Sequence, residues 1–173
     1  MFVSFLKHDL GRLAHLRGSR GVSLSSAFKD CQAIVEKYDS ENYQWIKQLP
    51  AETRAPIIAL RAFNAETSII GDMVTQGGPV LRKMRFEWWR NAIDKAYAGE
   101  SVDHPVITAI QHCVNVRSLS KYRFQRMISA KESDQVEHRS PQSMKELEDF
   151  VEATSSQLHY LQLEAIEDRK SVV

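Results

Sequence analysis

The chain has 173 residues, of which 43% are hydrophobic and 26% charged, and its formal net charge is +1. This composition is typical of one globular domain, and the near-neutral charge does not point to a protein that binds nucleic acid. No apolar run comes near the length that crosses a bilayer. The two cysteines, Cys31 and Cys113, belong to no paired motif, so we interpret them as small core residues in a reducing compartment.

The first 21 residues differ in charge from the rest of the chain. They hold four lysines and arginines against a single acid, Asp9. Apolar residues recur in this segment at helical spacing, at Phe2, Leu6, Leu10 and Leu13. An amphipathic, arginine-bearing and acid-poor N-terminus is typical of a mitochondrial transit peptide, and an ordinary basic tail is the alternative.

The first half of the remaining sequence predicts three helices. Ser25 or Ser26 caps the first, whose apolar face is formed by Phe28, Cys31, Val35 and Tyr38. Pro50 and Pro56 mark helix starts, because proline suits a first turn. The second helix is expected from Pro56 toward Val74. Gly77, Gly78 and Pro79 then open a third, which ends near Gly99 and faces inward through Leu81, Met84 and Trp88.

The second half predicts three more helices. One begins at His104 and Pro105 and buries Val106, Ala109, Ile110 and Cys113. Ser120 caps the next, which buries Phe124, Met127 and Ile128. Residues 143–146 form a capping box that starts a long helix. Its apolar stripe consists of Leu147, Phe150, Val151, Thr154, Leu158 and Leu161.

The sequence lacks strand signals, because it has no alternating run and no Asn-Gly turn. We therefore expect an all-α fold in three segments: a leader over 1–21, a helical domain over 22–166 and a polar tail over 167–173. The last helix has few elements left to cover its apolar side. This predicts a domain that is incomplete at the C-terminus and that exposes apolar stripes for interaction or aggregation.

A polar stripe crosses the second predicted helix. Arg61, Ala65, Ser68 and Asp72 are spaced by four, three and four, so they line one helical face. Carboxylates at i and i+4 on such a face can hold Mg²⁺ together with substrate phosphates. Here Ser68 takes the first of those positions and carries no charge. No nucleophile motif and no metal-ligand spacing occurs elsewhere, so we expect no catalytic residue and no bound metal.

Four stretches in chain order resemble the squalene/phytoene synthase family, the head-to-head prenyltransferases of the all-α isoprenoid synthase fold. They are LPAETRAPIIALRAFN, RFEWWRNAIDKAYAGESVDHPV, FQRMISAKESD and MKELEDFVEATSSQL. The resemblance covers nearly all residues after the leader. It stops before the family's second aspartate-rich motif, and it implies an isoprenoid-synthase-like helical domain.

The resemblance also implies a diphosphate and Mg²⁺ site that this chain has lost in part. The family has aspartates at the positions of Ser68 and Asp72, and only Asp72 is kept. The family has a basic residue near the diphosphate at the position of Glu41. In this chain the charge there is reversed, and a carboxylate opposes the binding of an anion. The family also has an acid at the position of Ser129, which this chain lacks, whereas the acid at Asp134 is kept. We interpret these five residues as vestigial diphosphate and metal positions.

A non-catalytic branch of the family matches better, through LPAETR, through ALRAFN followed by Glu66, and through the isolated Asp72. That branch acts in mitochondria, early in the assembly of respiratory complex I (NADH:ubiquinone oxidoreductase). The resemblance implies a pseudoenzyme without a cofactor, located on the matrix side of the inner membrane. Its partners would be complex I subunits, assembly intermediates or a lipid, with peripheral membrane contact and no nucleic acid.

The alternative function is that of a Mg²⁺-dependent prenyl-diphosphate transferase that makes squalene- or phytoene-like products. This reading needs Mg²⁺, Asp72, Asp134 and a second aspartate motif, and the last of these is absent from the sequence.

Overall fold

The computed structural model describes residues 22–74, 78–137 and 141–167. Within these ranges every regular element is helical and no strand occurs, which confirms the predicted all-α class. The leader over 1–21 and residues 168–173 of the polar tail lie outside the described residues, so those two predictions remain predictions.

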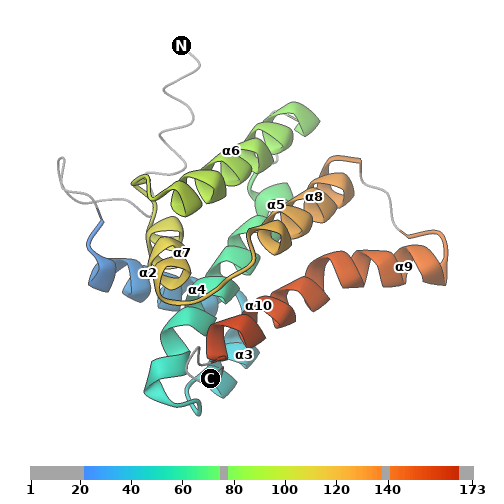
Figure 1. Ribbon diagram of the computed structural model, residues 1–173. Helices are drawn as coiled ribbons and strands as arrows, with labels where there is room; N and C mark the ends of the chain where they lie inside the picture. The colour runs from blue at the N-terminus through green and yellow to red at the C-terminus, as the bar shows by residue number, and fades with distance from the viewer. Residues whose placement is uncertain (1–21, 75–77, 138–140, 168–173) are drawn as a thin grey trace.

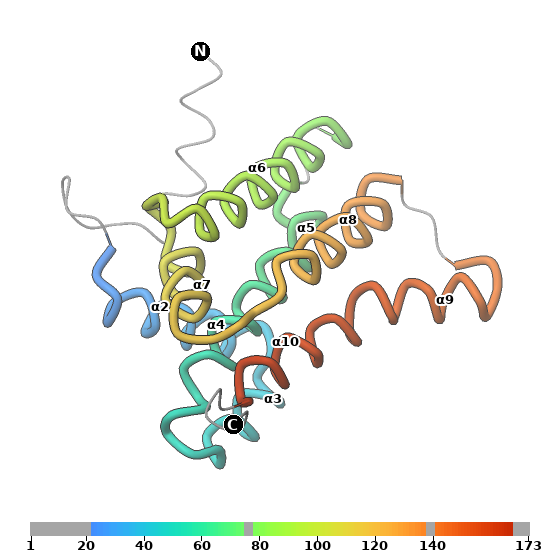
Figure 2. The backbone as a smooth tube through the Cα atoms, viewed as in Figure 1, coloured from blue at the N-terminus to red at the C-terminus, as the bar shows by residue number. Residues whose placement is uncertain are grey.

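The helices pack around α4, which runs through the middle of the fold (Figures 1 and 2). α4 contacts α2, α7 and α10, and α6 packs across α7 and α8. The helices are α2 (Leu24–Tyr38), α3 (Ser40–Ile46), α4 (Ala51–Ser68), α5 (Ile70–Met73), α6 (Gly78–Ala98), α7 (Pro105–Val116), α8 (Lys121–Glu137), α9 (Met144–Val151), the π-helical segment η1 (Glu152–Ser156) and α10 (Gln157–Ile166).

Three aromatic side chains join the central helices. Phe63 of α4 meets Trp89 of α6 edge to face, with ring centroids 5.5 Å apart, and Phe124 of α8 at 5.2 Å. All three are buried. Aromatic pairs in this geometry add to the stabilisation that burial provides. The apolar faces predicted for α7 and α8 are buried as expected.

Both cysteines are free and buried, which confirms their interpretation as core residues. Burial raises the pKa of the Cys113 thiol to about 12, and that of Cys31 rises for the same main reason. A thiol with a raised pKa yields little of the reactive thiolate, so neither cysteine suits a nucleophilic role.

Two predicted helix starts are wrong by a few residues. Ser23, not Ser25 or Ser26, caps α2, because its hydroxyl accepts a hydrogen bond from the Ser26 N–H at 3.2 Å. α4 begins just after Pro50, and Pro56 lies inside the helix. Pro56 removes only the bond to the Glu52 carbonyl, and Glu52 is exposed, so water can satisfy that group.

The inward face predicted for α6 is also wrong. Met84 and Trp88 are exposed, with exposed fractions of 50% and 37%. Phe86, Trp89 and Ile93 are buried instead. Both faces of this helix are apolar in sequence, so the spacing alone does not show which one packs against α8. The sequence therefore located the helix and chose the wrong side.

The capping box at the start of α9 is confirmed in its first half. The Ser143 hydroxyl accepts from the Glu146 N–H at 3.1 Å, whereas the Glu146 carboxylate accepts from the N–H of Gln142 at 2.8 Å. The apolar stripe predicted for the long helix is buried only in its C-terminal part. Leu158 and Leu161 are buried in α10, but no residue of α9 is buried.

A carboxylate holds α10 against the start of α8. Glu164 accepts hydrogen bonds from the Ser120 N–H at 2.9 Å, from the Ser120 hydroxyl at 2.8 Å and from Arg123 Nε at 2.7 Å. The Ser120 hydroxyl thus donates to another helix. Arg123 also donates to Gln157 at 3.0 Å, so one guanidinium contacts two turns of α10.

Glu164→Gln is expected to lower the free energy of unfolding by about 2 kcal/mol, because an amide leaves the partly buried Arg123 without its anionic partner. Urea denaturation followed by circular dichroism measures this change. Glu36→Gln, at an exposed position on α2, is the matched control and should change stability by less than about 0.5 kcal/mol. Equal effects of the two substitutions would contradict the role given to Glu164.

Candidate functional site

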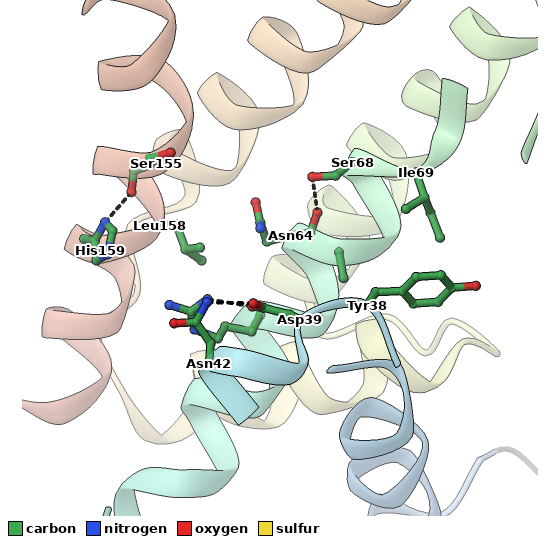
Figure 3. Close-up of a pocket in the computed structure, with 11 residues that line it drawn as sticks. Tyr38, Asp39, Asn42, Asn64, Ser68, Ile69, Ser155, Leu158 and His159 are labelled. Carbon is green, nitrogen blue, oxygen red and sulfur yellow. Dashed lines mark hydrogen bonds and ion pairs between the residues drawn. The ribbon is translucent and has the colours of Figure 1, made fainter. Parts of the chain in front are cut away.

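A cavity of about 340 Å³ lies between α4, the turn from α2 to α3, and the segment η1–α10 (Figure 3). Most of the residues that line it carry a polar group, although apolar atoms also contribute to its surface. The residues are Tyr38, Asp39, Asn42, Arg61, Asn64, Ala65, Ser68, Ile69, Ser155, Leu158 and His159. Arg61, Ala65 and Ser68 belong to the polar stripe of the sequence, so the structure places most of that stripe on a cavity wall.

The charges on this wall neutralise each other. Arg61 Nη1 lies 2.6 Å from Asp39 Oδ2, and both side chains are mostly buried. The amide of Asn42 donates to the other oxygen of Asp39 at 2.6 Å. The guanidinium is therefore held by a carboxylate of the same protein, which weakens its attraction for an incoming anion.

The opposite wall comes from the π-helical segment and α10. His159 lies with Nδ1 2.8 Å from the Ser155 carbonyl oxygen, and both residues face the cavity across from Asn64 and Ser68 (Figure 3). π-helical turns commonly occur at functional sites. Here the turn places hydroxyl and imidazole groups, rather than carboxylates, at the cavity.

Lys131 of α8 reaches the same face of α4 and was missed by the sequence reasoning. Its Nζ lies 2.7 Å from Asn64 Oδ1, 2.9 Å from the Asn64 carbonyl, 2.9 Å from Thr67 Oγ1 and 2.9 Å from Ser68 Oγ. The four acceptors are all uncharged. Burial lowers the pKa of the Lys131 ammonium to about 7. In sequence Lys131 is one of many charged residues, and only its contacts with α4 distinguish it.

The predicted stripe breaks before Asp72. α4 ends at Ser68, and the chain restarts as α5 at Ile70. The side chain of Gln135 bridges the break: its Nε2 donates to the Thr67 carbonyl at 3.0 Å, and its Oε1 accepts from the Gly71 N–H at 2.7 Å. A Cβ at Gly71 would lie 3.3 Å from that oxygen, so glycine suits the close approach.

The five vestigial positions do not all line one pocket. Of them, only Ser68 lines the cavity, and Asp72 is exposed on α5 beyond the break. Glu41 is exposed on α3, beside Asn42 but outside the lining. Ser129 lines a separate hollow of about 190 Å³, and Asp134 is exposed on α8. The single helix expected from Pro56 toward Val74 is interrupted at Ile69, so Ser68 and Asp72 lie on two different helices.

Glu66 and His104 form a buried pair away from the cavity. Glu66 Oε2 lies 3.4 Å from His104 Nε2, and the imidazole packs against the rings of Trp88 and Trp89. Burial raises the pKa of Glu66 to about 7 and lowers that of His104 to about 4. Near neutral pH His104 is therefore uncharged and Glu66 is only partly ionised, because burial disfavours the charged form of each group.

Among the residues that the structure describes, no three histidine, cysteine or acidic side chains are grouped so that they could hold a metal ion. None of the helices in the described ranges combines the length and the apolar character that a bilayer crossing needs.

The all-helical fold and the polar stripe on α4 are the features that the resemblance to the squalene/phytoene synthase family predicted. The chain belongs to this family, whose model it matches over residues 35–172.

Among its relatives are proteins named NADH dehydrogenase (ubiquinone) complex I, assembly factor 6. The Drosophila melanogaster homolog is 38% identical over 79% of this chain and 41% of its own length. The Bos taurus protein is 31% identical over 84% of this chain and 43% of its own length, and the Homo sapiens protein 30% over 79% and 40%. The chain thus spans about two-fifths of the curated relatives it matches. No solved structure matches it.

Proposed function

We propose that the chain is a non-catalytic factor in the assembly of mitochondrial respiratory complex I, on the matrix side of the inner membrane, and that it works by binding a subunit or an assembly intermediate. The name that its relatives carry supports the assembly role. The basic, acid-poor composition of residues 1–21 supports the mitochondrial location.

The observation that carries the non-catalytic part is the position of Lys131. Its ammonium lies 2.9 Å from Ser68 Oγ, at the position where the family resemblance implies a metal-binding carboxylate. Neither the Ser68 hydroxyl nor the Lys131 amine supplies the negative charge with which carboxylates hold Mg²⁺. Lys131 Nζ also contacts the Asn64 and Thr67 oxygens beside Ser68. The residues present therefore do not fit a metal where the enzyme would need it.

The cavity itself is too small to hold a segment of a protein partner. Its volume of about 340 Å³ is at the small end of the range for ligand sites. We therefore assign the binding of a partner to the outer surface of the domain rather than to an inherited apolar cavity.

The test is deletion of the gene followed by measurement of assembled complex I on native gels. We expect the level of complex I to fall and to recover when the wild-type coding sequence is restored. Asp72→Ala should restore it as well as wild type does, because the exposed carboxylate has no catalytic task in this proposal. Asp94→Ala, at another exposed acid, is the matched control.

The alternative Mg²⁺-dependent prenyl transferase makes the opposite prediction. In it, the longest natural form would convert farnesyl or geranylgeranyl diphosphate in the presence of Mg²⁺, and Asp72→Ala would abolish the product. That result, or complex I levels that stay unchanged after gene deletion, would overturn the proposed function.

A further inference from the structure

α9 is the least covered helix among those described. None of its residues is buried, and its main contact is with η1, which continues it along the chain. In Figures 1 and 2 it lies at the edge of the molecule, away from the centre formed by α4. A helix of eight residues is not stable alone in water, so its form depends on contacts outside itself.

One side of α9 is apolar and open. Met144, Leu147 and Val151 are spaced by three and four, so they form one stripe on the helix. Their exposed fractions are 70%, 42% and 43%, although hydrophobic residues of this size are usually buried. We call these three residues the α9 stripe. Three aligned exposed side chains on one helix are typical of a protein interface.

The α9 helix and the residue that follows it are acidic. Residues 144–152 contain four aspartates and glutamates against one lysine, although the whole chain has a formal net charge of +1. Glu148 lies next to the stripe, one turn from Met144, and is exposed. The charge around this helix would attract a basic partner and repel an anionic lipid surface or a nucleic acid.

We propose that the α9 stripe docks a basic amphipathic helix of a partner protein, whose apolar residues cover the stripe while its lysines and arginines face Glu148 and the neighbouring acids. An amphipathic helix laid along apolar anchors spaced by three, four and seven residues is a common recognition mode. A second copy of this chain fits poorly, because two acidic surfaces would meet. The inference goes beyond the proposed function, since it names the chemistry of a partner whatever assembly it serves.

Direct binding to the full chain tests the proposal. The probe is a fluorescent, idealised leucine–lysine helical peptide of about 18 residues, five turns long, and fluorescence anisotropy follows its binding. We expect saturable binding that weakens as salt is added, because exposed charges are screened. A peptide of the same composition with its leucines and lysines scrambled should bind at least roughly tenfold more weakly, a difference of about 1.4 kcal/mol.

Variants locate the peptide on the surface. Met144→Ser combined with Leu147→Ser should weaken binding by roughly tenfold or more, and Glu148→Lys should weaken it and reduce its dependence on salt. Val80→Ser, on α6 and also highly exposed, is the matched control and should bind like wild type. All of these positions are exposed, so thermal melts should show that each variant still folds.

Four results would overturn the proposal. They are no saturable binding, equal binding of the scrambled peptide, an equal loss in the Val80→Ser control, and a dimer of the chain that the Met144→Ser, Leu147→Ser variant abolishes. Protection of the α9 amides from hydrogen exchange in the longest natural form without any peptide would also overturn it, because another segment of the protein would then cover the stripe.

Discussion

Phe63→Ala is expected to lower the free energy of unfolding by about 3 to 5 kcal/mol, the range for deleting a large buried aromatic side chain. Phe63 is fully buried on α4 and meets Trp89 and Phe124 edge to face. Its removal leaves a cavity where three helices meet and ends both ring contacts. Since whole domains are stable by only about 5 to 15 kcal/mol, this one change should shift the urea midpoint markedly.

Two further variants check that the effect comes from the cavity. Phe63→Leu keeps most of the volume and should lose clearly less stability than Phe63→Ala. Tyr122→Ala removes an aromatic ring from a half-exposed position on α8 and should cost about 1 kcal/mol or less. If Phe63→Ala and Tyr122→Ala shifted the urea midpoint equally, the central position of Phe63 in the core would be wrong.

Lys131→Met is expected to change the pH dependence of stability. Burial lowers the pKa of folded Lys131 to about 7, whereas the ordinary value is 10.5. Between these two values the unfolded chain binds a proton that the folded chain does not, so wild-type stability gains a contribution that rises with pH. The gain is about 1.4 kcal/mol per pH unit and totals several kcal/mol between about pH 7 and pH 10.

The measurement is the free energy of unfolding in urea at several pH values for wild type and Lys131→Met. The difference, wild type minus variant, should become more positive as the pH rises through this window. Taking the difference cancels the groups that both chains share, including the buried thiols, whose raised pKa values act in the opposite direction.

Lys29→Met is the control, because Lys29 is exposed on α2. Its stability curve should run parallel to that of wild type. A Lys131→Met curve that also ran parallel to wild type would show that the ammonium is not buried among the α4 oxygens as described.

Helix formation was predictable from local sequence because its signals are local. The spacing of apolar residues and the positions of Pro50 and Pro105 located α4 and α7, and the apolar faces of α7 and α8 are buried as expected. The faces of α6 and α9 were not predictable, since each carries apolar residues whose burial depends on which neighbours arrive.

The candidate site was predictable only in part. The sequence identified Ser68 as a lost carboxylate and Arg61 as its neighbour on one face, and both line the cavity. It did not reveal the break at Ile69, nor the amide of Gln135 that bridges it from 68 residues beyond the Thr67 carbonyl. A contact between residues so far apart in the chain produces no periodic pattern in the sequence.

By itself the sequence determined the helical class, the family and the absence of a paired aspartate on α4. Only the tertiary structure decided which group lies beside that position. It is Lys131 Nζ, which donates hydrogen bonds to oxygens of Asn64, Thr67 and Ser68. The physical reason is that a helix is specified by neighbours three and four residues apart, whereas the charge at a site depends on side chains that folding brings from distant segments.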